Sequence, residues 1–207
     1  MFWKDASRSW FSVIVSPISL GDRLHGQQEK PMELPQFKYH PAPLTTGSIA
    51  PSDEVCEVCG RGRGYVYRAG TYGLRELTTV CPWCIADGSA HEQFGVEFTD
   101  RASIGDGEWE AVSEEIANEV AFRTPGFSGW QQERWFTHCG DAAEFLGSMG
   151  MEQLERVGPD AVELIRVESG YDATQWKSYY ESLDAQRGPR AYLFKSPLRK
   201  ARRLLRL

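Results

Sequence analysis

Apolar residues recur at helical spacing over much of the second half of the chain. Val112, Ile116 and Val120 define one helix, which the Thr124-Pro125-Gly126 run ends. The same spacing predicts four further helices, over residues 142–146, 151–157, 160–167 and 176–183. Asp141, with Glu144 three residues later, has the spacing of an N-cap for the first of these four.

The first half of the chain has a different pattern. Prolines between Leu34 and Pro51 set extended and turn geometry and exclude a long helix there. Two short runs rich in aromatic or β-branched residues, 64–68 and 77–80, are separated by turn-forming glycines. These two runs predict a small antiparallel ribbon.

The composition is that of a folded protein with an acidic body. The 207 residues carry a net charge of −6, and residues 106–184 alone hold 17 acidic and 5 basic side chains. Such a surface disfavours general attraction to nucleic acid or to anionic membranes. No apolar stretch near the start is long enough to span a membrane, so we expect no membrane span.

Two C-x-x-C pairs flank the predicted ribbon. Cys56 and Cys59 are followed, after 21 intervening residues, by Cys81 and Cys84. Each pair bends its backbone so that both sulfurs face one point, and a hairpin brings the two pairs together as a tetrahedral four-thiolate cage. The spacing predicts these four cysteines as ligands of a structural zinc ion, a cage with no open coordination position for catalysis.

Other chemistry for these thiols stays open. Two redox dithiols have the same local pattern, but neither pair follows a strand in a β-α-β context. Iron is an alternative metal, because the identity of the ligands alone does not distinguish zinc from iron. Reduced thiols that hold a metal suit the cytoplasm better than a disulfide framework does, so we expect a cytoplasmic protein.

These observations predict an α+β fold, in which an irregular, small zinc-ribbon-like β part packs against a mostly helical C-terminal part. The ribbon covers about residues 52–90 and the helical part about residues 107–185, within a domain spanning residues 32–194. Residues 1–31 are expected to be a flexible N-terminal extension that arises from a mis-assigned start. Residues 195–207 form a Leu/Arg tail with six basic and no acidic residues. This composition fits a diverged or frame-shifted terminus or, as the alternative, a short amphipathic surface binder.

Outside the C-x-x-C pairs, the clearest candidate for chemistry is the adjacent pair His138 and Cys139. A cysteine beside a helix start and a histidine can act as nucleophile and base. A lone cysteine is more often a small buried hydrophobic residue, and we favour burial for Cys139. The pair nevertheless defines an enzyme alternative.

The remaining candidates are binding residues. His40 and His91 lack ligand spacing of their own, so we expect local hydrogen bonds rather than a second metal site, which is the alternative. The segment from Gly126 to Trp135 is rich in aromatics and amides, which suits a buried aromatic seam or a surface that stacks on a ligand. A candidate binding surface therefore comprises His40, Trp130, Gln131 and Gln132.

Several multi-residue segments together resemble the CbrC family, bacterial proteins of unknown biochemical activity that are regulated by the Cre two-component system. The resemblance spans about residues 33–147 and rests on residues 34–41, 56–59, 63–67, 81–90 and 124–141. It implies a link to tolerance of a DNA-cleaving colicin and supplies no catalytic residues. The chain departs from the family after Tyr192-Leu193-Phe194-Lys195, where relatives have a further C-x-x-C and this chain has Ser196-Pro197-Leu198-Arg199.

We therefore expect a zinc-stapled cytoplasmic protein that binds a partner, most simply another protein, in stress or colicin tolerance and has no chemistry of its own. The first alternative is an enzyme with a His/Cys or metal centre around His138 and Cys139. The second is a nucleic-acid-binding zinc-ribbon protein that uses the ribbon and the basic tail, which the acidic body disfavours.

Overall fold

Short strands and helices are distributed over three small hydrophobic cores. The computed structural model describes residues 33–105, 109–129, 132–196 and, as backbone only, 202–205, all within one unit, Glu33–Leu207. The predicted extension, residues 1–31, lies outside the described residues. The mixture of helices and antiparallel strands confirms the α+β class.

The first core lies in the cysteine-bearing part. Strand β1 (Ile49–Pro51) pairs antiparallel with β2 (Tyr65–Tyr67), and helices α1 (Pro82–Ala86) and α2 (Ser89–Phe94) follow. The predicted strand at 64–68 is confirmed, but its predicted partner is wrong. Residues 77–80 form no ladder, because the Thr79 and Val80 carbonyls accept from two different segments, at Glu57 and Tyr67 respectively.

The second core is aromatic and surrounds helix α3 (Glu114–Arg123), which a short 3₁₀ turn (Arg101–Ser103) precedes. The helix begins where the Ser113 hydroxyl accepts from the Ile116 amide, and it ends before Thr124, as its spacing predicts. The two-stranded hairpin of β3 (Thr137–His138) and β4 (Asp141–Ala142) also contributes to this core.

Strand β5 (Glu144–Met149) lies between the second and third cores. It pairs antiparallel with β6 (Ala191–Lys195), which pairs in turn with β7 (Arg202–Leu205). The predicted helix at 142–146 is therefore wrong. Phe145 packs into the aromatic core and Leu146 packs against the third core. Because both faces of the strand are covered, its apolar residues do not alternate with polar ones, and they mimic helical spacing.

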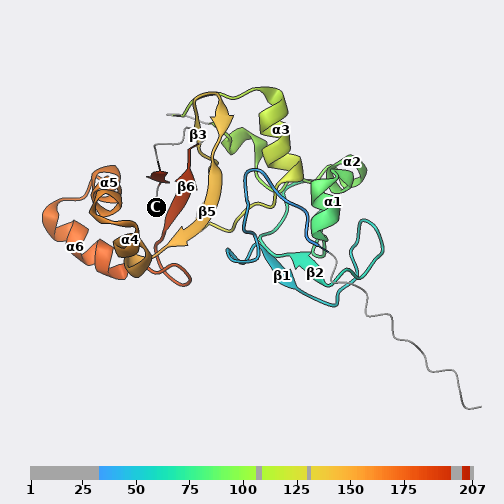
Figure 1. The fold of residues 1–207 in the computed structure, drawn as a ribbon, viewed down its shortest axis with the longest axis horizontal. Helices are drawn as coiled ribbons and strands as arrows, with labels where there is room; N and C mark the ends of the chain where they lie inside the picture. Colours follow the sequence, from blue (N-terminus) through green and yellow to red (C-terminus); the bar gives the residue numbers. More distant parts are fainter. Residues whose placement is uncertain (1–32, 106–108, 130–131, 197–201, 206–207) are drawn as a thin grey trace, which may run out of the picture. The chain divides into compact units, whose positions relative to one another are not determined.

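The third core is formed mainly by the last helices. These are α4 (Met151–Val157), α5 (Pro159–Ser169) and α6 (Ala173–Ser182), all three of which the sequence predicts. Figure 1 shows them gathered beside the β5–β6 pair. The predicted "mostly helical" C-terminal part thus also contains a three-stranded sheet. Its last strand, β7, comes from the predicted basic tail.

Membrane-spanning helices are absent from the described residues, since none combines the necessary length and apolar character.

Candidate metal centre

The four cysteines of the two C-x-x-C pairs converge on one point. Their Sγ atoms all lie within 4.8 Å of one another. The separations are 3.9 Å for Cys56–Cys84, 3.8 Å for Cys59–Cys81 and 3.5 Å for Cys81–Cys84. A disulfide needs about 2.05 Å, whereas four sulfurs at 2.3 Å from a tetrahedral zinc lie about 3.8 Å apart. The four cysteines, which we call the cysteine cage, therefore fit a metal ion.

Both knuckles are held by their backbones. The Gly60 amide donates to the Cys56 carbonyl at 2.8 Å, and Gly60 adopts φ 67°, which glycine reaches without strain. The second knuckle opens helix α1, with Cys81 as its N-cap residue and Pro82 in its first turn. The Cys81 amide donates to the Cys56 Sγ at 3.3 Å, so the backbone of one knuckle contacts a sulfur of the other.

Glu57 joins the two knuckles, a role that the sequence analysis missed. One carboxylate oxygen accepts from the amides of Thr78 and Thr79 at 2.8 and 2.9 Å, and from both hydroxyls at 3.0 and 3.1 Å. These donors, the Thr79 amide foremost, lower the pKa of Glu57 to about 2. The carboxylate thereby ties the Cys56–Cys59 knuckle to the segment that leads into Cys81.

The cysteine cage lies in the first hydrophobic core, where Cys56, Cys81 and Cys84 are buried and Cys59 is half-buried. A hydrogen bond from the Cys81 thiol lowers the pKa of Cys56 and raises the pKa of Cys81, while burial raises the pKa of Cys84. The protein alone thus favours a thiolate at Cys56 and opposes one at Cys81 and at Cys84. Four thiolates at this spacing need a cation to balance their charge.

Comparison with known proteins assigns the family. The model of an uncharacterised protein family, UPF0167, matches residues 34–202. The chain therefore belongs to the UPF0167 family. UPF0167 proteins of Mycobacterium bovis and Mycobacterium tuberculosis are each 44% identical to it over 170 residues, which is 80% of this chain and 88% of theirs. One of Pseudomonas aeruginosa is 39% identical over 163 residues, 78% of this chain and 89% of its own. No solved structure matches the chain.

Membership in UPF0167 corrects the resemblance to the CbrC family. The matching model and the three relatives all carry the UPF0167 description, which is a different family name. The match covers residues 34–202 and so includes the later helices, which lie beyond the span of the CbrC resemblance. The link to colicin tolerance rested on the CbrC resemblance alone and is withdrawn with it.

His40 is buried and has both ring nitrogens bonded. Nδ1 lies 2.7 Å from the Pro125 carbonyl oxygen and Nε2 lies 2.7 Å from the Thr46 hydroxyl. Since a carbonyl only accepts, Nδ1 carries the proton and Nε2 accepts from Thr46. This side chain is therefore neither a metal ligand nor part of an exposed binding surface.

Acid should weaken the fold through His40. Burial lowers its pKa from 6.5 to about 4, so between these values the unfolded chain binds more protons than the folded one. The contribution of His40 to stability is therefore complete above pH 6.5 and declines as the pH falls toward 4. We expect about 2 kcal/mol less stability at pH 5 than at pH 7.5 from this residue. Urea unfolding of the wild type and of His40→Gln at both pH values measures the difference. An imidazole that titrates near pH 6.5 by NMR would contradict it.

His91 is also engaged within the fold. Its Nδ1 lies 3.0 Å from the Val96 carbonyl oxygen, and its ring stacks on Phe122 with the centroids 3.5 Å apart. Within the part of the chain that the structure describes, neither His40 nor His91 belongs to a cluster of potential metal ligands. The alternative of a second metal site between these two histidines is thus not supported.

His138 and Cys139 lie at the β3–β4 turn rather than at a helix start. The prediction of a buried Cys139 is wrong, because the side chain is exposed on the turn. Its Sγ lies 3.8 Å from Nε2 of His138. Glu110 completes a cluster of three potential ligands with this pair. The sequence analysis missed Glu110, since nothing in its spacing connects it to a turn 28 residues away.

The aromatic segment before that hairpin is structural where it is described. Trp135 is completely buried and donates from Nε1 to the Ala143 carbonyl at 3.0 Å. Trp130 and Gln131 lie outside the described residues. Gln132 is exposed and donates from its amide to the Asp100 carboxylate. The candidate binding surface is thus reduced, among the described residues, to Gln132.

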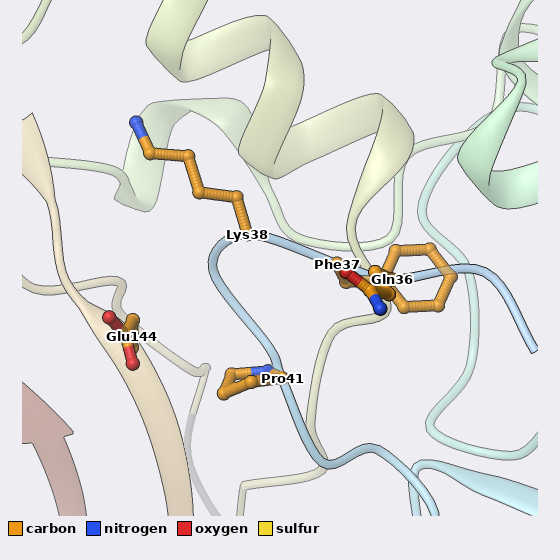
Figure 2. A pocket seen from close by; sticks show the side chains of 5 residues that line it. All are labelled: Gln36, Phe37, Lys38, Pro41 and Glu144. Carbon is orange, nitrogen blue, oxygen red and sulfur yellow. The ribbon is translucent and has the colours of Figure 1, made fainter.

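One open pocket lies beside β5. Figure 2 shows its lining side chains, which are Gln36, Phe37, Lys38, Pro41 and Glu144. Both charged groups already have partners in the chain. Lys38 pairs with Asp141 at 3.0 Å and Glu144 pairs with Lys195 at 2.9 Å. With its charges neutralised internally, this pocket offers little electrostatic attraction to an ionic ligand.

Proposed function

We propose that this UPF0167 protein binds one structural zinc ion through Cys56, Cys59, Cys81 and Cys84 and serves as a zinc-stapled binding protein. The observation that carries the proposal is the spacing of the sulfurs, which is 3.5–3.9 Å for three of the pairs and within 4.8 Å for all of them. Zinc is preferred to iron because a Cys₄ set joined by two knuckles is typical of structural zinc sites. Bound zinc adds a cross-link between two segments that the Glu57 carboxylate already joins by hydrogen bonds.

An architectural role follows from the closed ligand set. Four protein thiolates leave no coordination position for water or substrate. The cysteines also form part of the first core, together with short elements such as β2 and α1. Elements of three and five residues do not persist alone, so the metal supports the β1–β2 and α1–α2 segments.

A protein partner suits this chain better than nucleic acid does, because its acidic body disfavours binding of a phosphate backbone. Val55, next to the first cysteine, and Leu74 are large apolar side chains with exposed fractions of 58% and 110%. These two side chains are the proposed contacts for that partner. Reduced, closely spaced thiols support a cytoplasmic location.

Catalysis by His138 and Cys139 has one observation in its favour, the 3.8 Å contact between thiol and ring. The other ring nitrogen, however, is bonded to the Ser196 hydroxyl at 3.2 Å. Catalytic Cys–His pairs orient the ring through an amide or a carboxylate instead. The proposed function therefore assigns no nucleophilic role to Cys139.

Metal analysis of the intact, freshly purified protein under reducing conditions tests the proposal. Native mass spectrometry and elemental analysis are expected to find one zinc per chain that survives desalting and leaves with a strong chelator. Cys81→Ser should lack this ion, whereas Gly62→Ala, a change between the knuckles that touches no ligand, should keep it. A chain that carries no metal, or that carries iron in its place, would refute the zinc assignment.

A further inference from the structure

A second group of potential ligands lies at the β3–β4 turn, separate from the cysteine cage. Glu110, His138 and Cys139 each offer one ligand atom, and these atoms lie within 4.8 Å of one another. The Sγ atom of Cys139 and Nε2 of His138 are 3.8 Å apart. We call these three residues the turn cluster. It combines a thiol, an imidazole and a carboxylate, the three side-chain types that zinc uses.

The backbone of the turn brings neighbouring side chains to the same side. Strand residues next to each other normally point to opposite faces. Here His138 pairs with Asp141, and the two residues between them, Cys139 and Gly140, have φ values of 56° and 71°. Two left-handed residues form a tight turn of the type that joins antiparallel strands. Cys139 is the one non-glycine residue with a positive φ in the described part of the chain, and this conformation places its sulfur beside the His138 ring.

Two further hydrogen bonds orient the other ligands. Nδ1 of His138 bonds to the hydroxyl of Ser196, a side chain that is 2% exposed, so Nε2 is the nitrogen left for a metal. The Gly140 amide donates to Oε2 of Glu110 at 3.2 Å and holds this carboxylate against the turn. Hydrogen bonds that orient a ligating imidazole or carboxylate in this way are characteristic of protein metal sites.

We propose that the turn cluster is a second, mononuclear site for Zn²⁺, with three protein ligands and one open coordination position. Three ligands and an open position distinguish it from the closed cysteine cage. Glu110 and Cys139 are exposed and His138 is half-buried, so this ion exchanges with solvent more readily than one in the buried cage. The open position accepts water or an anionic ligand.

Cobalt and zinc titrations of the full-length, reduced protein test the proposal. After the cysteine cage has been filled with one equivalent of Zn²⁺, added Co²⁺ is expected to bind as a second equivalent, with a thiolate-to-cobalt absorption band. Competition with a chromophoric zinc chelator gives the affinity of this second equivalent. Cys139→Ser should abolish the band, and His138→Gln and Glu110→Gln should each weaken the second equivalent roughly tenfold or more.

The controls separate the two sites. Glu92→Gln, on the exposed face of α2, should leave both equivalents unchanged. All turn-cluster variants should retain the first, chelator-resistant equivalent of zinc in the cysteine cage. Loss of this first ion would therefore bear on the cysteine cage and not on the turn cluster. Wild-type protein that binds no metal beyond the cage, or a second equivalent that survives Cys139→Ser, would overturn the turn-cluster site.

Discussion

Cys81→Ser is expected to remove the metal and to lower the free energy of unfolding by about 4 kcal/mol or more. Cys81 is 1% exposed, caps α1, and contacts the sulfurs of both Cys59 and Cys84. A serine in its place breaks the ligand set and leaves a hydroxyl in an apolar core. For a chain of this size the loss corresponds to a fall of about 10 °C or more in the thermal midpoint.

Cys139→Ser provides the matched control, because it makes the same chemical change at an exposed turn. Its free energy of unfolding should stay within about 0.5 kcal/mol of the wild type. Thermal and urea unfolding of proteins loaded with one equivalent of Zn²⁺, which fills the cysteine cage alone, compare the two variants, with metal content measured on the same samples. Equal stability of Cys81→Ser and the wild type would show that the cysteines do not staple the fold.

The cysteine cage was the most predictable part of the molecule. Two C-x-x-C pairs at this separation specify a meeting point through local knuckle geometry, whatever the chain between them does. This independence explains why the four sulfurs converge although β2 pairs with β1 and not, as predicted, with residues 77–80. The supporting role of the Glu57 carboxylate was not predictable. Its donors, Thr78 and Thr79, lie in a segment that the sequence pattern wrongly predicts to be a strand.

The wrong helix prediction at residues 142–146 has a physical cause. A half-buried strand can be predicted from the alternation of apolar and polar residues along it. Strand β5 lacks this alternation because it is covered on both faces, with Phe145 in one core and Leu146 against another. The helices α3 to α6 each bury only one face and retain the spacing that predicts them. Cys139, expected near a helix start, lies instead at the exposed turn of the β3–β4 hairpin. The turn cluster exists only because a hairpin, and not a helix, follows His138, so the sequence pattern could not predict it.

Gly126→Ala is expected to destabilise the fold by about 3 kcal/mol or more, although it adds a single methyl group. A Cβ atom at this position would overlap the Phe98 carbonyl oxygen and would lie 2.9 Å from the Tyr67 hydroxyl. Phe98 and Tyr67 belong to the first core, while the next residue, Phe127, belongs to the second. Gly126 thus lies where two cores meet, and the atom in its way is backbone, which cannot turn aside as a side chain can.

Gly62→Ala is the control for this prediction, because its added Cβ would meet only the Asp53 carbonyl oxygen, at 3.9 Å. The stability of Gly62→Ala should remain within about 0.5 kcal/mol of the wild type. Urea unfolding of the metal-loaded chains measures both variants, and insoluble Gly126→Ala beside soluble Gly62→Ala would count as the expected loss. If the two glycine variants unfolded at the same urea concentration, the close approach of the two cores at Gly126 would be refuted. Its position directly after Thr124-Pro125 would then reflect only the end of α3.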